Sequence, residues 1–357
     1  MPAYKDDARG TWFVSFYYDD WQGEHKRKMK RGFASKKEAL AWEREFLLRQ
    51  SADPDMEFGD FVRLYLADKR GRLRESTWVS KIQIIDTKLL PFFARRKLTE
   101  IETHDVIAWQ NEMLSYRSPE GEPYAPTYLR AMHNQLSAVF NHAVLYYGLK
   151  SNPAALAGSM GKESSRKIQF WTQEEYRRFI VTMQGREHSY LAFELLYWCG
   201  MRVGELLALT PADFDLSRPA VSISKSYQRL NQRDFITEPK TPKGIRIIQL
   251  PPFLAEEVRA YLAKQKTPPD ARIFPFTKKR LHDEMRRGAA ESGVKRIRIH
   301  DLRHSHISLL IDLGFSAVAI ADRVGHESID ITYRYAHLFP SRQEEMVRRL
   351  ESLHGEE

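Results

Sequence analysis

Residues 298–304 read Arg298-Ile299-His300-Asp301-Leu302-Arg303-His304, and they mark the start of a helix expected over 301–313. His300 opens that helix and Arg303 follows one turn later, so the two side chains point from one face. An imidazole beside an arginine that can bind phosphate suits proton transfer or hydrogen bonding to an oxyanion. The crowding of His300, His304 and His306 raises zinc binding as an alternative. That alternative is weak, because neither an HExxH pattern nor a cysteine partner accompanies these histidines.

A second arginine lies upstream, in Cys199-Gly200-Met201-Arg202-Val203-Gly204-Glu205, between helices expected over 187–199 and 203–209. Glu205 follows Arg202 by three residues and can hold the guanidinium on the same helical face. Arg202 can then present two N–H groups to a phosphate. Alone this pattern is weak, since arginines near helix starts are usually solvated or structural.

A turn rich in lysine and proline, Pro239-Lys240-Thr241-Pro242-Lys243-Gly244, separates strands expected over 233–237 and 246–250. Prolines and glycine are typical of turns, so the two strands are expected to form a hairpin with Lys240 at its tip. A lysine in this place is ordinary exposed charge unless the loop folds over a site.

The segment Val324-Gly325-His326 is followed nine residues later by Tyr335, within Tyr333-Arg334-Tyr335-Ala336-His337. Ser328 can cap a helix expected over 329–337, which places Tyr335 on that helix. Tyr333 is expected to pack against the domain body. Any one of these tyrosines is more commonly a packing residue than a nucleophile. Together, however, the four segments supply the groups needed for phosphoryl transfer to a tyrosine hydroxyl.

This ordered set resembles the tyrosine recombinase (phage integrase) family. That family carries an arginine in Gly-x-Arg-x-x-Glu, a hairpin lysine, a His-x-x-Arg pair, a Gly-His and a late tyrosine, in this order. The matching stretches here are CGMRVGELLAL, EPKTPKGIRIIQLP, HDLRHSH and VGHESIDITYRYAH. The resemblance implies as catalytic residues Arg202, Lys240, His300, Arg303, His326 and Tyr335, with Glu205 behind the first arginine.

The resemblance also implies a mechanism, in which the Tyr335 hydroxyl attacks a DNA phosphodiester and forms a 3′-phosphotyrosyl bond. The two arginines clamp the phosphate oxygens, and His326 adds a hydrogen bond. His300 accepts the tyrosine proton or orients the phosphate, while Lys240 protonates the departing 5′-oxygen, with Lys243 as its rival. The covalent link conserves bond energy, so the reaction is expected to use no metal and no cofactor.

Two positions depart from the family pattern. Cys199 stands where threonine or serine is common before the glycine, and Gly204 stands where serine is common. Neither change removes a reacting group, but both bear on how Arg202 is supported.

The N-terminal part reads as a small sheet over 10–33 followed by a helix from Ser35 to about Arg49, with Glu38 completing a capping box. From Lys26 to Lys37 the chain carries seven basic residues and no acidic one. This segment is interpreted either as a solvated edge strand guarded by charge or as a strand laid against DNA. The candidate DNA-binding residues are Lys26, Arg27, Lys28, Lys30 and Arg31.

The fold class is therefore expected to be multidomain α+β. A three-stranded sheet with one helix precedes a helical region with apolar spacings of three and four, and a mixed, mainly helical part with a small antiparallel sheet follows. By resemblance, these are an arm-type DNA-binding domain (1–52), a SAM-like core-binding domain (55–152), a linker (153–169), a catalytic domain (170–340) and a tail (341–357).

Composition agrees with an enzyme that acts on nucleic acid. The 357 residues include 56 Lys and Arg against 47 Asp and Glu, a net charge of +9 that favours a polyanionic partner. The single cysteine excludes an internal disulfide, and no run of about 18 apolar residues predicts a membrane span. No secretory signal is expected at the N-terminus. These features predict a cytoplasmic protein, and the resemblance implies association with the nucleoid of a bacterial host.

The leading hypothesis is a site-specific integrase of a phage or an integrative mobile element. A Xer-like resolvase or transposon recombinase with the same chemistry is one alternative, and a non-catalytic DNA-binding protein is another. The resemblance implies as partners double-stranded DNA with core-type and arm-type sites, three further copies of the chain in a synaptic tetramer, and a host DNA-bending protein and an excisionase.

Overall fold

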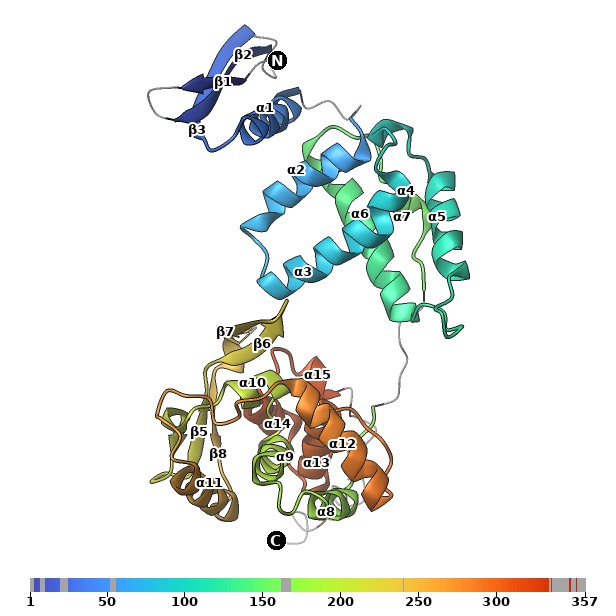
Figure 1. Cartoon of the computed structure of the whole chain (residues 1–357). Helices are drawn as coiled ribbons and strands as arrows, with labels where there is room; N and C mark the ends of the chain where they lie inside the picture. The colour runs from blue at the N-terminus through green and yellow to red at the C-terminus, as the bar shows by residue number, and fades with distance from the viewer. Residues whose placement is uncertain are drawn as a thin grey trace. The chain divides into compact units, whose positions relative to one another are not determined.

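The computed structural model describes residues 3–6, 10–19, 25–51, 56–161, 168–239, 241–333, 335, 347 and 351. The chain divides into two compact units, Met1–Ser165 and Arg166–Glu357 (Figure 1). Lys240 and nearly all of the tail after Tyr335 lie outside the described residues. No helix among the described residues is long and apolar enough to cross a bilayer.

The N-terminal module is an antiparallel sheet of β1 (Ala3–Asp6), β2 (Thr11–Asp19) and β3 (His25–Phe33), packed against α1 (Lys36–Ser51). Alternation along β2 sends Val14 and Phe16 into the core beneath α1. Half of the expected capping box is present, because Ser35 Oγ accepts from the Glu38 N–H, but the Glu38 carboxylate accepts from the Ala34 N–H and not from that of Ser35.

The helical domain that follows contains α2 (Phe58–Arg70), α3 (Glu75–Ile84), α4 (Leu90–Phe93), α5 (Thr103–Ser115), α6 (Pro126–Tyr146) and α7 (Pro153–Ala157). A π-helical turn over Ile85–Leu89 joins α3 to α4 without a loop. Pro91 has no N–H to bond one turn back, which favours this change of register. The core is aromatic, with Phe58, Phe93 and Trp109 fully buried.

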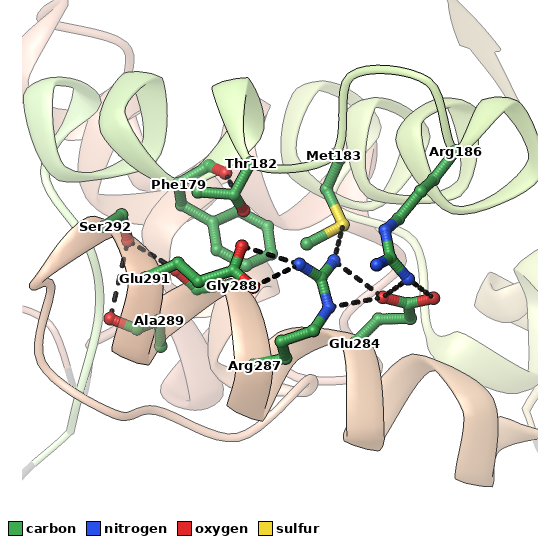
Figure 2. A network of polar contacts seen from close by, with 10 residues as sticks. All are labelled: Phe179, Thr182, Met183, Arg186, Glu284, Arg287, Gly288, Ala289, Glu291 and Ser292. Carbon is green, nitrogen blue, oxygen red and sulfur yellow. Dashed lines mark hydrogen bonds and ion pairs between the residues drawn. The ribbon is translucent and has the colours of Figure 1, made fainter.

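The C-terminal unit is mainly helical. Its helices are α8 (Gln173–Val181), α9 (Glu187–Cys199), α10 (Val203–Ala208), α11 (Pro252–Gln265), α12 (Lys278–Ser292), α13 (Asp301–Asp312), α14 (Ala317–Val324) and α15 (Asp330–Tyr333). α9 is buried on most of its surface because α8, α10, α11 and α13 all pack on it (Figure 1). α12 approaches the end of α8 closely at Gly288, where a Cβ would lie 2.6 Å from the Met183 methyl carbon (Figure 2).

Two small antiparallel sheets complete the unit. One has the order β4 (Phe214–Asp215), β5 (Ala220–Ile223) and β8 (Arg246–Gln249), and the other pairs β6 (Ser226–Leu230) with β7 (Arg233–Thr237). The expected hairpin between the strands at 233–237 and 246–250 is therefore wrong, because these strands belong to different sheets.

Two physical causes explain this pairing. Asn231 and Gln232 have positive φ angles of 47° and 63°, so the tight turn lies between β6 and β7. Val221 and Ile248 face each other across β5 and β8 and are both buried, so this pairing gains apolar burial. The connection that carries Lys240 consequently joins two sheets instead of closing a hairpin.

Candidate active site

A buried carboxylate organises the first arginine of the site. Arg202 is the N-cap of α10, and its Nη1 donates to Glu205 Oε1 at 2.7 Å while its backbone N–H donates to Glu205 Oε2 at 2.9 Å. The same Oε2 accepts a hydrogen bond of 2.9 Å from Arg246 Nη2. Glu205 therefore lies between two guanidinium groups, and only 2% of its surface is exposed.

The charge of Glu205 is maintained by these partners. Burial alone would raise its pKa, but the hydrogen bond from Arg246 and the charges of Arg246 and Arg202 outweigh burial and hold the pKa below its usual value. An ionised Glu205 fixes the Arg202 guanidinium, whose Nη2 also donates to the Gly325 carbonyl at 3.2 Å.

Arg303 is the second arginine, and it is almost fully buried on α13. Its Nη1 donates to the Gly200 carbonyl at 2.9 Å, whereas its buried Nη2 has no hydrogen-bond acceptor among the described residues. Burial, and then the charge of Arg202, lowers the Arg303 pKa to about 9. A buried donor without an acceptor is costly, and an anion placed here would satisfy it.

Two histidines face the same arginines. Burial, followed by the charges of Arg303 and Arg202, lowers the pKa of His326 to about 3. Burial and the charge of Arg303 also lower the pKa of His300, which occupies the N-cap position of α13. The Nδ1 of His326 shares a 2.8 Å hydrogen bond with the hydroxyl of Thr332. Both imidazoles are therefore neutral at pH 7 and able to hydrogen-bond to an oxyanion.

Tyr335 lies in the turn that follows α15, and its backbone N–H donates to the Thr332 carbonyl at 3.0 Å. The expected helix over 329–337 is thus seen only as Asp330–Tyr333 among the described residues. The Tyr335 side chain is 2% exposed, and its hydroxyl is hydrogen-bonded to His304 Nδ1. Tyr333 is 54% exposed, so the expectation that it packs against the domain body is wrong.

The glycine of the Gly-His segment has a steric role. Gly325 ends α14 with a φ of 70°, a conformation that strains other residues. A Cβ there would lie 2.6 Å from the Lys243 carbonyl oxygen and 3.0 Å from Arg246 Cδ. The absence of a side chain lets the connection at Lys243 approach Gly325, the residue before His326.

Comparisons with known proteins identify the family to which a site of this kind belongs. The sequence matches the Phage integrase family over residues 169–342, the Arm DNA-binding domain over 2–50, and the Phage integrase, N-terminal SAM-like domain over 57–114. The chain belongs to the phage integrase family of tyrosine recombinases. It is a tyrosine-type site-specific DNA recombinase.

Individual relatives cover nearly the whole chain. The ICEBs1 integrase of Bacillus subtilis (strain 168) is 27% identical over 95% of this chain and 96% of its own length. Among solved structures, the Tn1549 transposon integrase in complex with a circular intermediate DNA is similar with a TM-score of 0.67 at 18% identity, over 82% of this chain and 99% of that one. A lambda integrase tetramer bound to a Holliday junction gives 0.60 at 16% identity, over 93% and 94%.

Within this integrase, the structure brings together five of the six residues expected to be catalytic. Arg202, His300, Arg303, His326 and Tyr335 lie in one cluster, in which the charge of each arginine affects the neighbouring histidines. Lys240 lies outside the described residues, and Lys243 is exposed in a 3₁₀ turn over Pro242–Gly244. No group of three His, Cys, Asp or Glu side chains suited to a metal ion occurs in the described part of the chain.

Sequence reasoning missed two arginines that support the site. Arg246 donates to Glu205, to the Gly244 carbonyl and to the Arg323 carbonyl. Arg323 donates to His306 Nε2 and to the carbonyls of Gln249 and Trp198. A charged residue within the apolar stretch IRIIQL was the available signal for Arg246, whereas none marked Arg323.

The two departures from the family pattern have structural explanations. A Cβ on Gly204 would lie 2.6 Å from Ser226 Oγ and 3.0 Å from the Tyr227 carbonyl oxygen, so β6 can pass this close to α10 only because residue 204 is glycine. Cys199 is buried at the end of α9, and burial raises the pKa of its thiol to about 12. The thiol is therefore inert at neutral pH.

The basic residues of β3 divide between the two faces of the N-terminal sheet. Lys28 and Lys30 lie over the rings of Phe46 and Trp42 on α1, at 5.3 and 4.6 Å, and Lys26 is opposite Tyr18 on the same face. Arg27 and Arg31 lie on the other face, over the rings of Tyr17 and Phe13. That second face carries no helix of the module and exposes Tyr4, Tyr17 and Met29.

Proposed function

We propose that this integrase cuts and rejoins DNA at specific sites to insert and excise a phage or another integrative element. The observation that carries the proposal is the Arg303 guanidinium, which is buried beside Arg202 with one N–H donor unsatisfied. A phosphodiester oxygen supplies the missing acceptor, and Tyr335 belongs to the same cluster because its hydroxyl is hydrogen-bonded to His304, the residue that follows Arg303 on α13.

The proposed reaction conserves the phosphodiester energy. The Tyr335 oxygen attacks phosphorus, the bond to the 5′-oxygen breaks, and a 3′-phosphotyrosyl link forms. Arg202 and Arg303 neutralise the charge on the non-bridging oxygens, and neutral His326 donates a hydrogen bond to them. His300 accepts the proton of the Tyr335 hydroxyl or orients the phosphate. Lys240 protonates the departing 5′-oxygen, with Lys243 as the alternative on the same connection. A 5′-hydroxyl from the partner duplex reverses these steps.

The proposed division of labour follows the domain order. Residues 1–52 bind arm-type DNA, and 55–152 bind core-type DNA together with α7, which packs on α5 and α6. The rest of the expected linker 153–169 joins them to catalysis in 170–340, and the tail 341–357 packs on its own or a neighbouring protomer. Double-stranded DNA is the substrate, and four copies act on two duplexes. A host DNA-bending protein and an excisionase set direction, at the nucleoid of a bacterial host. The arm module favours an integrase over a Xer-like resolvase, which would need only core sites.

The test uses the full chain and a nicked duplex carrying the DNA segment that adjoins its gene. The wild-type protein should form a covalent adduct that survives denaturation, and peptide mass spectrometry should find a nucleotide on Tyr335. Tyr335→Phe should abolish the adduct and keep DNA affinity, because the hydroxyl serves chemistry more than binding. Tyr333→Phe is the matched control and should behave as wild type. A nucleotide on Tyr333, or an adduct that persists in Tyr335→Phe, would refute the assignment.

A further inference from the structure

A polar group in contact with the Tyr335 hydroxyl is a histidine to which the proposed mechanism gives no role. His304 lies on α13 one residue after Arg303, and its Nδ1 is hydrogen-bonded to the hydroxyl. We propose that His304 is a catalytic residue that takes the proton from Tyr335 during attack and returns it during rejoining. This inference rests on the proposed function and assigns the tyrosine proton to His304, which leaves His300 to orient the phosphate.

The geometry assigns a separate role to each ring nitrogen of His304. A phenol donates its proton, so Nδ1 of His304 acts as the acceptor and the neutral ring carries its hydrogen on Nε2. That Nε2 lies 3.7 Å from Oδ1 of Asp301, one turn earlier on α13. Asp301 is buried and held by Arg298, whose Nη2 donates to it at 2.7 Å. A carboxylate in this place stabilises the imidazolium that forms when the proton moves.

Burial and the surrounding charges keep the His304 imidazole unprotonated, so that it can accept a proton. Burial, then His300, Arg298 and Arg303, lowers its pKa to about 4, against the opposing charge of Asp301. The ring is therefore unprotonated at pH 7 and its lone pair is open to the tyrosine. A bound phosphodiester brings negative charge beside Arg303, which opposes the effect of Arg303 and raises the basicity of His304 when DNA is in place.

Every bond and proton of the cleavage step is accounted for by Tyr335, His304, Lys240 and the phosphodiester. The Tyr335 oxygen forms a bond to phosphorus as the bond from phosphorus to the 5′-oxygen breaks. The phenolic proton moves to His304 Nδ1, and Lys240 gives a proton to the 5′-oxygen. His300, whose ring centroid is 5.1 Å from that of His304, then serves the phosphate and not the nucleophile.

The test measures adduct formation on the nicked duplex between pH 6 and pH 10. His304→Ala should slow the reaction about 100-fold or more near pH 7, since general bases contribute ~10²–10⁴-fold. The rate of His304→Ala should rise with pH, because the phenol then ionises without a base. Added imidazole should restore part of the lost rate. His304→Gln restores a hydrogen-bond acceptor but no base, so it should stay slow.

A second substrate distinguishes protonation of the leaving group from deprotonation of the nucleophile. A duplex with a 5′-bridging sulfur leaves without protonation, so it should rescue Lys240→Ala but not His304→Ala. Equal rates for wild type and His304→Ala would overturn the proposal, and so would a wild-type rate in His304→Gln. A faster His304→Ala would overturn it too, because the histidine would then restrain the nucleophile instead of activating it.

A measurement on the intact protein covers variants that do not fold. In ¹⁵N-histidine spectra, the His304 Nδ1 signal should be that of an acceptor nitrogen and should shift in Tyr335→Phe. No shift would overturn the proposal. A wild-type chain that forms no adduct would refute the proposed function itself, which is distinguishable because every variant would then be equally inactive.

Discussion

Replacing Glu205 with glutamine removes the carboxylate that joins two guanidinium groups. The amide keeps an oxygen acceptor, but its NH₂ group must face one of the N–H donors that the carboxylate satisfied. We expect Glu205→Gln to destabilise the C-terminal unit and to slow DNA cleavage, because Arg202 loses its anchor.

The size of the effect follows from exposure. The Arg202 side chain is 40% exposed, so solvent screens its pair with Glu205 and that pair contributes at most about 1 kcal/mol. The Arg246 side chain is 7% exposed, and breaking a buried pair costs about 3–5 kcal/mol. Arg246 keeps two carbonyl acceptors, which favours the lower end. The expected decrease in the free energy of unfolding is about 3–4 kcal/mol, with cleavage slowed at least about tenfold.

Hydrogen exchange read by mass spectrometry is the suitable assay, because peptides from each unit report separately and a single melting temperature does not describe a multidomain chain. The matched control is Glu284→Gln. Glu284 also joins two arginines, Arg186 and Arg287, but their side chains are 44% and 29% exposed (Figure 2). This substitution should cost about 1 kcal/mol and leave cleavage unchanged.

The pH dependence gives a further check on the same residue. The folded pKa of Glu205 is depressed, so its contribution is present above the unfolded pKa near 4.5 and is lost as pH falls through the folded value. Wild type and Glu205→Gln should therefore converge in acid. If Glu205→Gln resembles Glu284→Gln in stability and cleaves at the wild-type rate, the reasoning about the buried pair is refuted.

Two other predictions concern the N-terminal sheet and the α9 core. Replacing Arg27 and Arg31 with alanine should flatten the dependence of log arm-DNA affinity on log salt by about 0.9 for each phosphate that the protein no longer neutralises. Replacing Lys28 and Lys30, which lie over rings of α1, should change this slope less; equal slopes in filter binding would contradict the assignment. Burial raises the pKa of Glu194 to about 7, so the folded state becomes less stable as pH rises from about 4.5 to 7. Glu194→Gln should be more stable than wild type at pH 8, on the order of 2–3 kcal/mol, and equal to it near pH 4 by hydrogen exchange; no difference at pH 8 would refute a raised pKa.

Local sequence determined much of the fold because helices and strands follow short-range spacing. The helix at 187–199 begins and ends at the expected residues, since apolar periodicity is a property of neighbouring residues. The hydrogen bond between Arg202 and Glu205 was also predictable, because residues three apart meet on a helix. The order of the four motifs indicated the family.

Tertiary structure alone decided the pairing of residues distant in the chain. β8 pairs with β5 because Ile248 is buried against Val221, a preference that no turn sequence reveals. Arg246 reaches Glu205 across 41 residues, and Tyr335 reaches His304 across 31, through hydrogen bonds that exist only once α10, β8, α13 and α15 have packed. The sequence by itself therefore indicated which groups we propose for the chemistry. The packed chain decided which of them touch, because burial and pairing depend on the whole domain and not on any one segment.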